Sequence, residues 1–123
     1  MKPSFSIGTD IVQVSRIGKL IQNKKFVERI FTPQEIHYCS GKKLAAQHYA
    51  VRFAAKEAVW KALSHQWGKR GVAHKEIRVY RTDSGKPIIQ LSSRLKKFEP
   101  YIFLSLSHTQ EHALATALFV SPS

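Results

Sequence analysis

The chain has 123 residues, 43% of them hydrophobic and 23% charged, which is the size and composition of one small globular domain rather than of a disordered or fibrous protein. Its 20 Lys and Arg outnumber 8 Asp and Glu, so a formal charge of +12 should attract polyanions such as nucleotides, nucleic acid or an acidic protein. There is no apolar run of the ~20 residues that a membrane helix needs, no signal-peptide pattern and only one cysteine, Cys39, so we expect a cytoplasmic protein that does not insert into membranes.

The first third of the chain predicts one strand followed by short helices. Alternating β-branched residues over 5–10 are typical of a strand that ends near Asp10. Apolar residues then recur at helical spacing over 11–21, and a helical turn continues over 26–31. Residues 32–35 (Thr-Pro-Gln-Glu) combine an N-cap, a proline at the first helical position and the glutamate of a capping box, so a brief helix should follow.

The longest predicted helix covers 42–66, which is rich in alanine and has no proline or glycine. Small aliphatic residues fill one of its faces, and Tyr49, Phe53 and Trp60 share the opposite one. A helix that is apolar on both sides is usually central, so we expect one side to pack on a sheet and the other to be covered by a second subunit. Glu57 lies beside the aromatic face and should therefore be partly shielded from water.

The last part of the chain predicts four strands, at 76–81, 87–91, 101–107 and 112–120. A glycine-containing turn joins the first two strands, and a short helical piece separates the two pairs. The sequence contains no linker, internal repeat or low-complexity segment. The order of one strand, several helices and four strands predicts a single α+β domain over residues 1–123, with a mainly antiparallel sheet packed on the long central helix.

Two of the eight acidic residues, Asp10 and Glu57, lie in apolar elements. Asp10 could be the N-cap of the helix that follows it, and Glu57 could form an ordinary ion pair with Lys61, four residues later. A metal site is the other interpretation, because Mg²⁺ typically binds one or two protein carboxylates and completes its shell with water and phosphate oxygens. Arg52, Lys56 and Lys61 are close in sequence and would suit a diphosphate bound to such a metal.

Two further groups of residues could contact anions. His108 and His112 flank the last predicted turn, but no third zinc ligand is evident, and a lone histidine at a strand end suits a surface hydrogen bond or a phosphate contact. Arg16, Lys19 and Lys24 give the first helical region a basic surface. This surface is either simply solvated or a docking site for an acidic protein.

Five segments resemble sequence blocks of one enzyme family and follow one another in the order of that family over nearly the whole chain. They are Ile7–Val12 with Arg16-Ile17, Phe31-Thr32 with Glu35, Arg52–Ala58 with Lys61, Ser84–Pro87, and Ser105–Thr109. The third resembles the helix signature of 4′-phosphopantetheinyl transferases, and the first resembles the opening of holo-[acyl-carrier-protein] synthases. The length is similar to that of the short members, which are homotrimers with sites at the subunit interfaces.

The resemblance implies an activity and roles for particular residues. Such enzymes transfer the 4′-phosphopantetheine arm of coenzyme A to a serine of an acyl carrier protein for fatty acid biosynthesis, and they release 3′,5′-ADP. Asp10 and Glu57 would be the ligands of Mg²⁺, which Mn²⁺ could replace, and both would be catalytic together with Lys61. The base that takes the serine proton could be Glu57 or a metal-bound water. The residues implied to contact coenzyme A are Arg52, Lys61, Lys86 and His108.

The resemblance also assigns a role to the basic first helical region and departs from the family in one loop. Arg16, Lys19 and Lys24 would dock the acidic carrier protein. After the signature helix the family usually has a Gly-Thr-Gly-like loop, whereas this chain has Ser64–Gly71. The contacts that the family makes through that loop are therefore not carried over.

Two other classes of function fit the charge. A nucleic-acid-binding protein should combine a basic stripe with exposed aromatic residues. Here Phe53 and Trp60 belong to a helix that we expect to be covered, and the chain has no recognisable nucleic-acid motif. A basic subunit without catalysis would leave Asp10 and Glu57 as structural ion pairs. The sequence thus favours the transferase, with no nucleic-acid partner.

Overall fold

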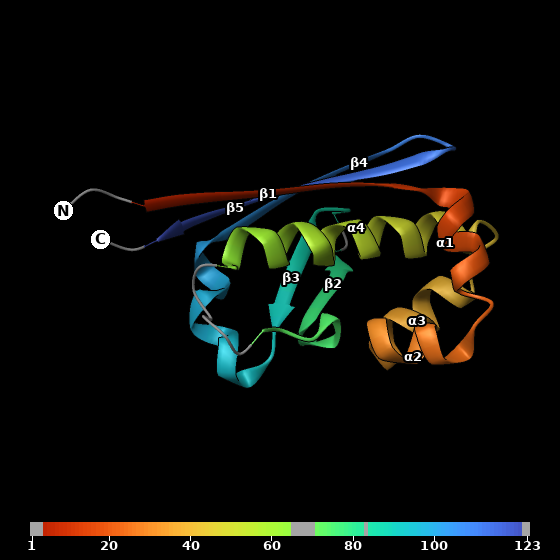
Figure 1. Ribbon diagram of the computed structural model, residues 1–123, viewed down its shortest axis with the longest axis horizontal. Helices are drawn as coiled ribbons and strands as arrows, with labels where there is room; N and C mark the ends of the chain where they lie inside the picture. Colours follow the sequence, from red (N-terminus) through yellow and green to blue (C-terminus); the bar gives the residue numbers. More distant parts are fainter. Residues whose placement is uncertain (1–3, 65–70, 83, 122–123) are drawn as a thin grey trace.

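A three-stranded antiparallel sheet and a long helix, α4 (Ala45–Leu63), form the centre of the molecule (Figure 1). The computed structural model describes residues 4–64, 71–82 and 84–121. The sheet has the order β1-β5-β4. Its strands are β1 (Ser4–Gln13), β4 (Ile102–His108) and β5 (His112–Ser121). Since β1 pairs with β5 over its full length, Ser4 lies opposite Ser121 and the two ends of the described chain are neighbours.

Small residues let the sheet and α4 lie close together. Three alanines of β5 are fully buried, and so are most alanines of α4. On β1, a Cβ added to Gly8 would overlap the carbonyl oxygen of Ala58 and would lie 2.7 Å from the amide nitrogen of Ala62. Glycine is therefore required at this crossing, since any side chain would push β1 away from α4.

Three short helices connect β1 to α4. They are α1 (Val14–Leu20), α2 (Lys24–Ile30) and α3 (Pro33–Ser40). The side chain of Asn23 accepts hydrogen bonds from the first amides of α2. At the start of α3, the Thr32 hydroxyl accepts from the Glu35 amide at 3.2 Å, and the Glu35 carboxylate accepts from the Thr32 amide at 2.8 Å. The predicted capping box is thus confirmed.

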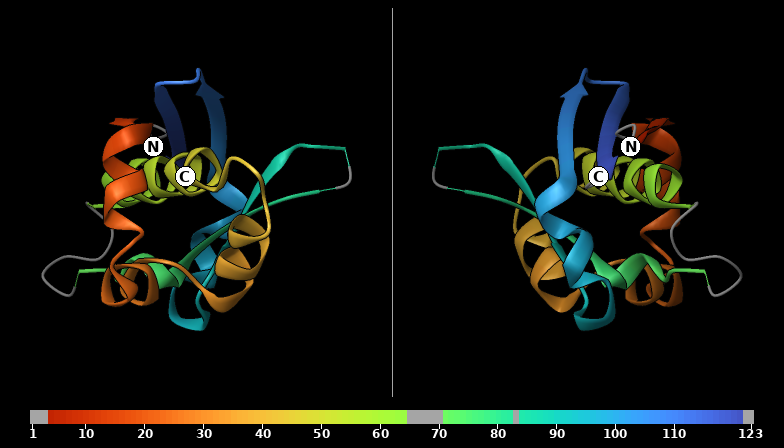
Figure 2. Two further views of the ribbon diagram at one scale, coloured as in Figure 1. Left: turned by 90° about the vertical axis from the view of Figure 1, so that its right-hand side faces the viewer. Right: turned by 90° about the vertical axis from the view of Figure 1, so that its left-hand side faces the viewer.

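A two-stranded hairpin of β2 (Ile77–Arg81) and β3 (Pro87–Leu91) makes a second sheet. The short helix η2 (His74–Glu76) precedes it, and η3 (Ser93–Tyr101) follows it. Figure 2 shows one end of the two paired strands of this hairpin projecting away from the helices. Gly85 has a φ of +84° in the turn, a conformation that glycine adopts without strain.

A buried ion pair fastens α3, α4 and the start of β2 to one another. The Lys56 ammonium lies 2.7 Å from the Glu35 carboxylate, and the two side chains are 0% and 1% exposed. Glu35 also accepts from the Val79 amide, while Lys56 donates to the carbonyl oxygens of His74 and Ile77. Burial lowers the pKa of Lys56, and the Glu35 charge opposes that shift. The expectation that Lys56 faces a diphosphate is therefore wrong, because its ammonium is enclosed by protein groups.

The predicted α+β class is confirmed, but the arrangement of the strands differs from the expectation. The strands form two separate antiparallel sheets rather than one. β1 continues to Gln13 instead of ending near Asp10, because β5 pairs with it all the way, and α1 begins at Val14 rather than at Ile11. The central helix begins at Ala45, and its predicted last residues, 65 and 66, lie outside the described residues. Within those residues, no helix combines the length and the apolarity needed to cross a membrane.

Candidate functional site

The crossing of β1 over α4 brings Asp10 and Lys61 together. The Lys61 ammonium donates to the Thr9 carbonyl oxygen at 2.9 Å and lies 3.3 Å from Oδ1 of Asp10. The Lys61 side chain remains 46% exposed, whereas that of Asp10 is 17% exposed. The pair therefore has a sheltered anion and a cation that still reaches solvent.

Asp10 lies in a setting that disfavours its charge. Burial raises the pKa of its carboxyl group, the hydrogen bond and charge of Lys61 oppose this, and the nearby charge of Glu57 raises the pKa further. Oδ2 of Asp10 is buried without a hydrogen-bond partner in the described part of the chain. The N-cap interpretation of Asp10 is wrong, because the residue at the N-cap of α1 is Gln13.

Glu57 is held by a histidine that the sequence analysis did not single out. Its Oε1 lies 3.2 Å from Nε2 of His74, and the two side chains are 27% and 31% exposed. The imidazole also stacks on the ring of Phe53, with centroids 5.9 Å apart and an interplanar angle of 11°. The expected pair of Glu57 with Lys61 is wrong, since Lys61 pairs with Asp10 instead. No local spacing could have indicated His74, which is 17 positions after Glu57 in the chain.

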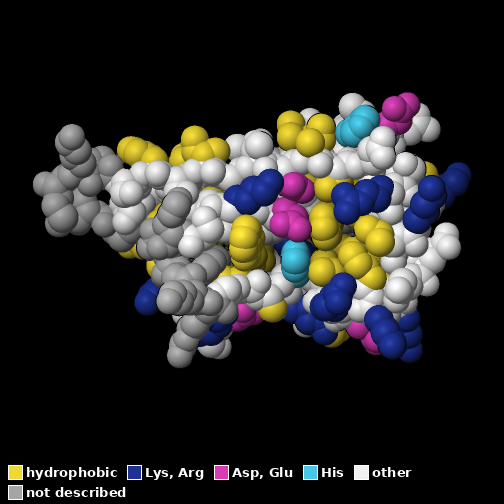
Figure 3. Space-filling model, in the orientation of Figure 1, with side chains coloured by type: hydrophobic (Ala, Val, Ile, Leu, Met, Phe, Trp, Pro, Cys, Tyr) yellow, Lys and Arg dark blue, Asp and Glu magenta, His cyan; other side chains and the backbone are white. Residues whose placement is uncertain are grey.

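The two carboxylates suit a divalent cation. Oδ1 of Asp10 and Oε1 of Glu57 have partners, whereas the buried Oδ2 of Asp10 has none among the residues described here. Figure 3 shows acidic side chains side by side over α4, between a basic side chain and a histidine. No group of three or more His, Cys, Asp or Glu side chains converges in the described ranges. A carboxylate pair with a buried oxygen that lacks a partner fits Mg²⁺, which retains water and substrate oxygens in its shell.

A second cluster, around Arg52, suits an anion. The guanidinium of Arg52 donates to the His48 carbonyl oxygen at 3.1 Å and lies 4.5 Å from the centroid of the Tyr38 ring. Arg52 is 3% exposed, and its Nε has no partner among the described groups. It lines a cavity of about 250 Å³ together with Arg81 and His108. The structure thus brings together Arg52 and His108, two of the residues implied to contact coenzyme A.

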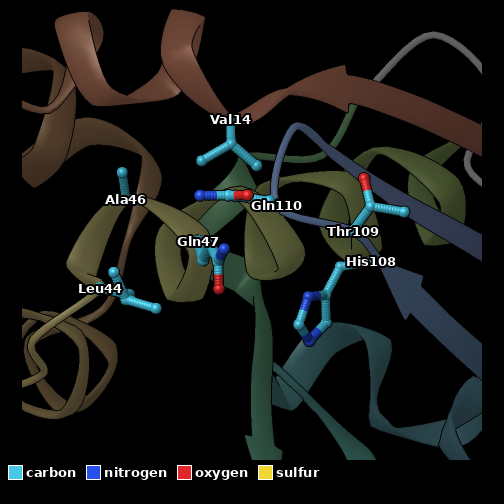
Figure 4. A pocket seen from close by; sticks show the side chains of 7 residues that line it. All are labelled: Val14, Leu44, Ala46, Gln47, His108, Thr109 and Gln110. Carbon is cyan, nitrogen blue, oxygen red and sulfur yellow. The ribbon is translucent and has the colours of Figure 1, made fainter.

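A larger cavity of about 510 Å³ continues from this cluster toward α1. Gln47 and His108 line both cavities. Figure 4 shows Gln47 and Gln110 in the middle of this cavity, with His108 and Thr109 on one side, Leu44 and Ala46 on the other, and Val14 above Gln110. Together the two cavities offer a basic end and a more apolar end, as a nucleotide requires.

The carboxylate pair and the Arg52 cluster lie on opposite sides of α4. Arg52 and Lys61 are separated by about two and a half turns of one helix, so their side chains leave it in opposite directions. A single described chain therefore presents the candidate metal ligands on one side and the anion cluster on the other.

The remaining predicted site residues lie at the periphery. Lys86 is exposed beside the hairpin turn and lines a separate cavity of about 460 Å³, so this chain does not bring it to Arg52. Arg16, Lys19 and Lys24 are exposed on α1 and at the start of α2. Arg16 is close enough to Asp10 for its charge to lower the pKa of that carboxyl group. The basic surface thus adjoins the carboxylate pair.

Comparisons with known proteins identify the family to which the chain belongs. The model of the 4′-phosphopantetheinyl transferase superfamily matches residues 6–117. Holo-[acyl-carrier-protein] synthases are similar to the chain: that of Ruminiclostridium cellulolyticum is 43% identical over 91% of this chain and 89% of its own, and that of Clostridium botulinum Eklund 17B is 46% identical over 91% and 94%.

Two solved structures extend the similarity to the fold. The synthase of Bacillus anthracis, in complex with CoA (3′,5′-ADP), has a TM-score of 0.78 and 37% identity over 95% of this chain and 96% of its own. That of Helicobacter pylori, in complex with coenzyme A, has a TM-score of 0.75 and 32% identity over 94% and 99%. With a family match over nearly its whole length, the chain belongs to the 4′-phosphopantetheinyl transferase superfamily.

Proposed function

We propose that this protein is a holo-[acyl-carrier-protein] synthase, which transfers the 4′-phosphopantetheine arm of coenzyme A to a serine of an apo acyl carrier protein. The observation that carries the proposal is the carboxylate pair of Asp10 and Glu57 beside Lys61, in a chain of this family. The carrier protein belongs to fatty acid biosynthesis. The reaction takes place in the cytoplasm, a reducing compartment in which a free thiol such as that of Cys39 stays reduced.

In the reaction, the carrier serine hydroxyl attacks the β-phosphate of coenzyme A and 3′,5′-ADP leaves. Asp10 and Glu57 would hold Mg²⁺, or Mn²⁺ in its place, which neutralises charge on the diphosphate when bound. Lys61 has an exposed ammonium with a third donor available beyond Thr9 and Asp10, so it can donate to a phosphate oxygen. Charged groups that are already in position around the phosphoryl group stabilise the charge that develops on its oxygens in the transition state, and they need not reorganise during the reaction.

We also propose a homotrimer with sites between neighbouring copies. The outer face of the three-stranded sheet exposes a group of apolar side chains, namely Phe5, Ile7, Ile11, Phe103 and Leu114, at 40–68%. Ile7, Leu118 and Phe103 are direct cross-strand neighbours, so the patch is continuous. Exposed apolar patches of this kind mark interaction sites. The aromatic face of α4, which was expected to need a cover, exposes only Trp60 at 40% and buries Tyr49, whereas the sheet exposes five large apolar side chains.

A shared site explains why the two clusters of one chain face apart. If a neighbouring copy presents its Arg52 and His108 to the carboxylate pair of the first, one coenzyme A can contact both. The basic residue Lys86, on the projecting hairpin, can then serve a neighbour's site. Arg16, Lys19 and Lys24, which adjoin the carboxylates, would receive the acidic carrier protein.

The test of the activity is direct. The purified protein is incubated with coenzyme A, Mg²⁺ and an apo acyl carrier protein, and the carrier is weighed intact by mass spectrometry. We expect the mass of one phosphopantetheine arm to be added, no addition in excess chelator, and recovery when Mg²⁺ or Mn²⁺ is returned. An unmodified carrier in the presence of metal, with an established synthase modifying the same carrier in parallel, would contradict the proposal.

A further inference from the structure

The imidazole of His74 is held against Glu57 by a ring stack and a hydrogen bond. Its ring stacks on Phe53, one helical turn before Glu57 on α4, and its Nε2 lies 3.2 Å from Oε1 of that carboxylate. An ionised carboxylate can only accept hydrogen bonds, so the contact requires a proton on Nε2. The stack fixes the plane of the ring, and the hydrogen bond fixes one oxygen of Glu57.

Hydrogen bonds also hold the backbone around His74 in place. Its carbonyl oxygen accepts from the Lys56 ammonium at 3.1 Å, and Lys56 is anchored by the buried Glu35. Two residues later, both carboxylate oxygens of Glu76 accept from the Arg94 guanidinium at 2.7 Å, and one of them also accepts from the Ala73 amide at 3.0 Å. The segment that carries His74 is therefore tied to α4 on one side and to η3 on the other.

This anchoring has a consequence for the carboxylate. The Glu57 side chain has several rotatable bonds and would otherwise sample many rotamers at its half-exposed position. With Oε1 bound to His74, the other oxygen is left to bind a cation together with the unpartnered Oδ2 of Asp10. Outer partners that orient metal-binding side chains are worth about 10- to 100-fold in metal affinity.

We propose that His74 is a positioning residue, which orients Glu57 for the divalent cation. The proposal rests on the proposed function, since it needs the metal to bind at Asp10 and Glu57. His74 takes part in no chemical step and acts only through its hydrogen bond to the Glu57 carboxylate.

The experiment measures Mn²⁺ binding by electron paramagnetic resonance, with coenzyme A present and no carrier protein, so that no turnover occurs. A titration of Mn²⁺ with coenzyme A alone corrects for metal bound outside the protein. The variants are His74→Phe, which keeps a ring for the stack on Phe53 but has no donor, and His74→Gln, which keeps an N–H donor. His37→Phe, at an exposed position of α3, is the matched control.

We expect His74→Phe to raise the Kd of Mn²⁺ by about tenfold, His74→Gln to raise it by clearly less, and His37→Phe to leave it unchanged. In the transfer assay, the activation constant for Mg²⁺ should rise in step, whereas KM for the carrier protein should not. Thermal unfolding of each metal-free variant, measured in parallel, shows that the titrations are made on folded protein.

Equal Kd values for the wild type and His74→Phe would overturn the role of His74 while leaving the metal site intact. Equal weakening in the Phe and Gln variants would overturn it as well, since the donor would then be irrelevant. A wild-type protein that binds no Mn²⁺ beyond coenzyme A alone would overturn the metal site itself, and with it this inference. The experiment therefore distinguishes a wrong role for His74 from a wrong metal site.

Discussion

Asp10 shows how one side chain can be unfavourable for folding and still suit a ligand. Its carboxylate is sheltered, faces the like charge of Glu57 and keeps a buried oxygen without a partner in the described ranges. Each of these features costs free energy in the metal-free protein, and Lys61 offsets only part of it. A divalent cation would reverse the balance, because it supplies the partner that Oδ2 lacks.

The first prediction concerns Asp10→Asn, which keeps the shape of the side chain and removes its charge. The wild-type Tm should rise when Mg²⁺ and coenzyme A are added, because a ligand that binds only the folded state stabilises it. In Asp10→Asn this rise should be absent and transfer activity should be lost, while the Tm of the metal-free protein stays at or above that of the wild type. Differential scanning fluorimetry in chelator and in Mg²⁺ checks both statements. A rise equal to that of the wild type would contradict the metal assignment.

The second prediction concerns the pH dependence of the Glu76–Arg94 pair. The hydrogen bond from Arg94 is the main cause that lowers the pKa of Glu76 from 4.5 to about 2. A lowered pKa means that the carboxylate stabilises the folded protein above pH 4.5 and that this contribution is lost as the pH falls toward 2. Glu76→Gln should therefore be less stable than the wild type at pH 6, and the difference should shrink below pH 4.5. Urea unfolding at a series of pH values measures it; a constant difference would refute the assignment.

At the scale of elements, the contact between β1 and α4 determines where the site residues meet. Asp10 is on β1, whereas Lys61 and Glu57 are on α4, and no local feature of either element joins them. Gly8 permits the close approach, since even a methyl group there would overlap the helix backbone.

The third prediction follows from that approach. Gly8→Ala should lower the free energy of unfolding by about 1–3 kcal/mol, as overpacking does, and should also reduce transfer activity because Asp10 moves away from Lys61. Gly18→Ala is the control: its added methyl group would meet only the Ala46 side chain at 3.5 Å, an ordinary contact within a helix. We expect Gly18→Ala to be as stable as the wild type or more so. Denaturant unfolding of both variants decides; equal stability of Gly8→Ala and the wild type would show that the crossing is not tight.

Local sequence patterns predicted the helices and strands better than the contacts between residues of different elements. The capping box at Thr32 and Glu35 depends on residues three positions apart, so the sequence alone contained it. The end of β1 depends on its pairing with β5 about a hundred positions later, and so Asp10 was wrongly expected at a strand end. His74 and Lys56 were missed or misassigned for the same reason, because their partners come from other elements. Arg52 and His108 were each noted from the sequence as possible phosphate contacts, but only the resemblance to a family implied that both contact the same ligand, and the fold brings them to one cavity.

At the scale of the whole molecule, an apolar sheet face and a high positive charge point to two kinds of association. In the proposed assembly, copies of the same chain would bury the apolar face by symmetry. The charge of +12 suits an acidic partner that arrives and leaves. The two surfaces can therefore be tested separately.

The fourth prediction concerns assembly. Light scattering behind a sizing column should report about three chains per particle for the wild type. Ile7→Asp places a charge in the middle of the exposed sheet face and should give monomers with little transfer activity, although Asp10, Glu57 and Lys61 are unchanged. His37→Asp adds the same charge to an exposed position of α3 and should remain assembled and active. A monomeric wild type at micromolar concentration would contradict the proposal.

The fifth prediction concerns the carrier protein. Arg16→Glu should raise KM for the carrier while leaving KM for coenzyme A nearly unchanged, because charge pairs at an exposed rim mainly steer encounter. Such pairs are screened over about 8 Å at physiological salt, so added salt should weaken carrier affinity more in the wild type than in the variant. Steady-state kinetics with each substrate, at low and moderate salt, measure both effects. A higher KM for coenzyme A alone would mean that Arg16 belongs to the nucleotide site.

The pairing of β1 with β5 also decides when the protein can become active during its synthesis. β1 is the first described element to leave the ribosome and β5 is the last, so the sheet cannot close until β5 has been synthesised. Until then, the exposed apolar residues of β1 have no neighbour strand, because β5 is the strand that pairs with β1. Pairing between the ends of a chain is slow to form, and unpaired strands are prone to aggregate. A nascent chain that stalls before β5 would therefore lack a complete sheet and would present β1 as an unpaired strand, which favours aggregation.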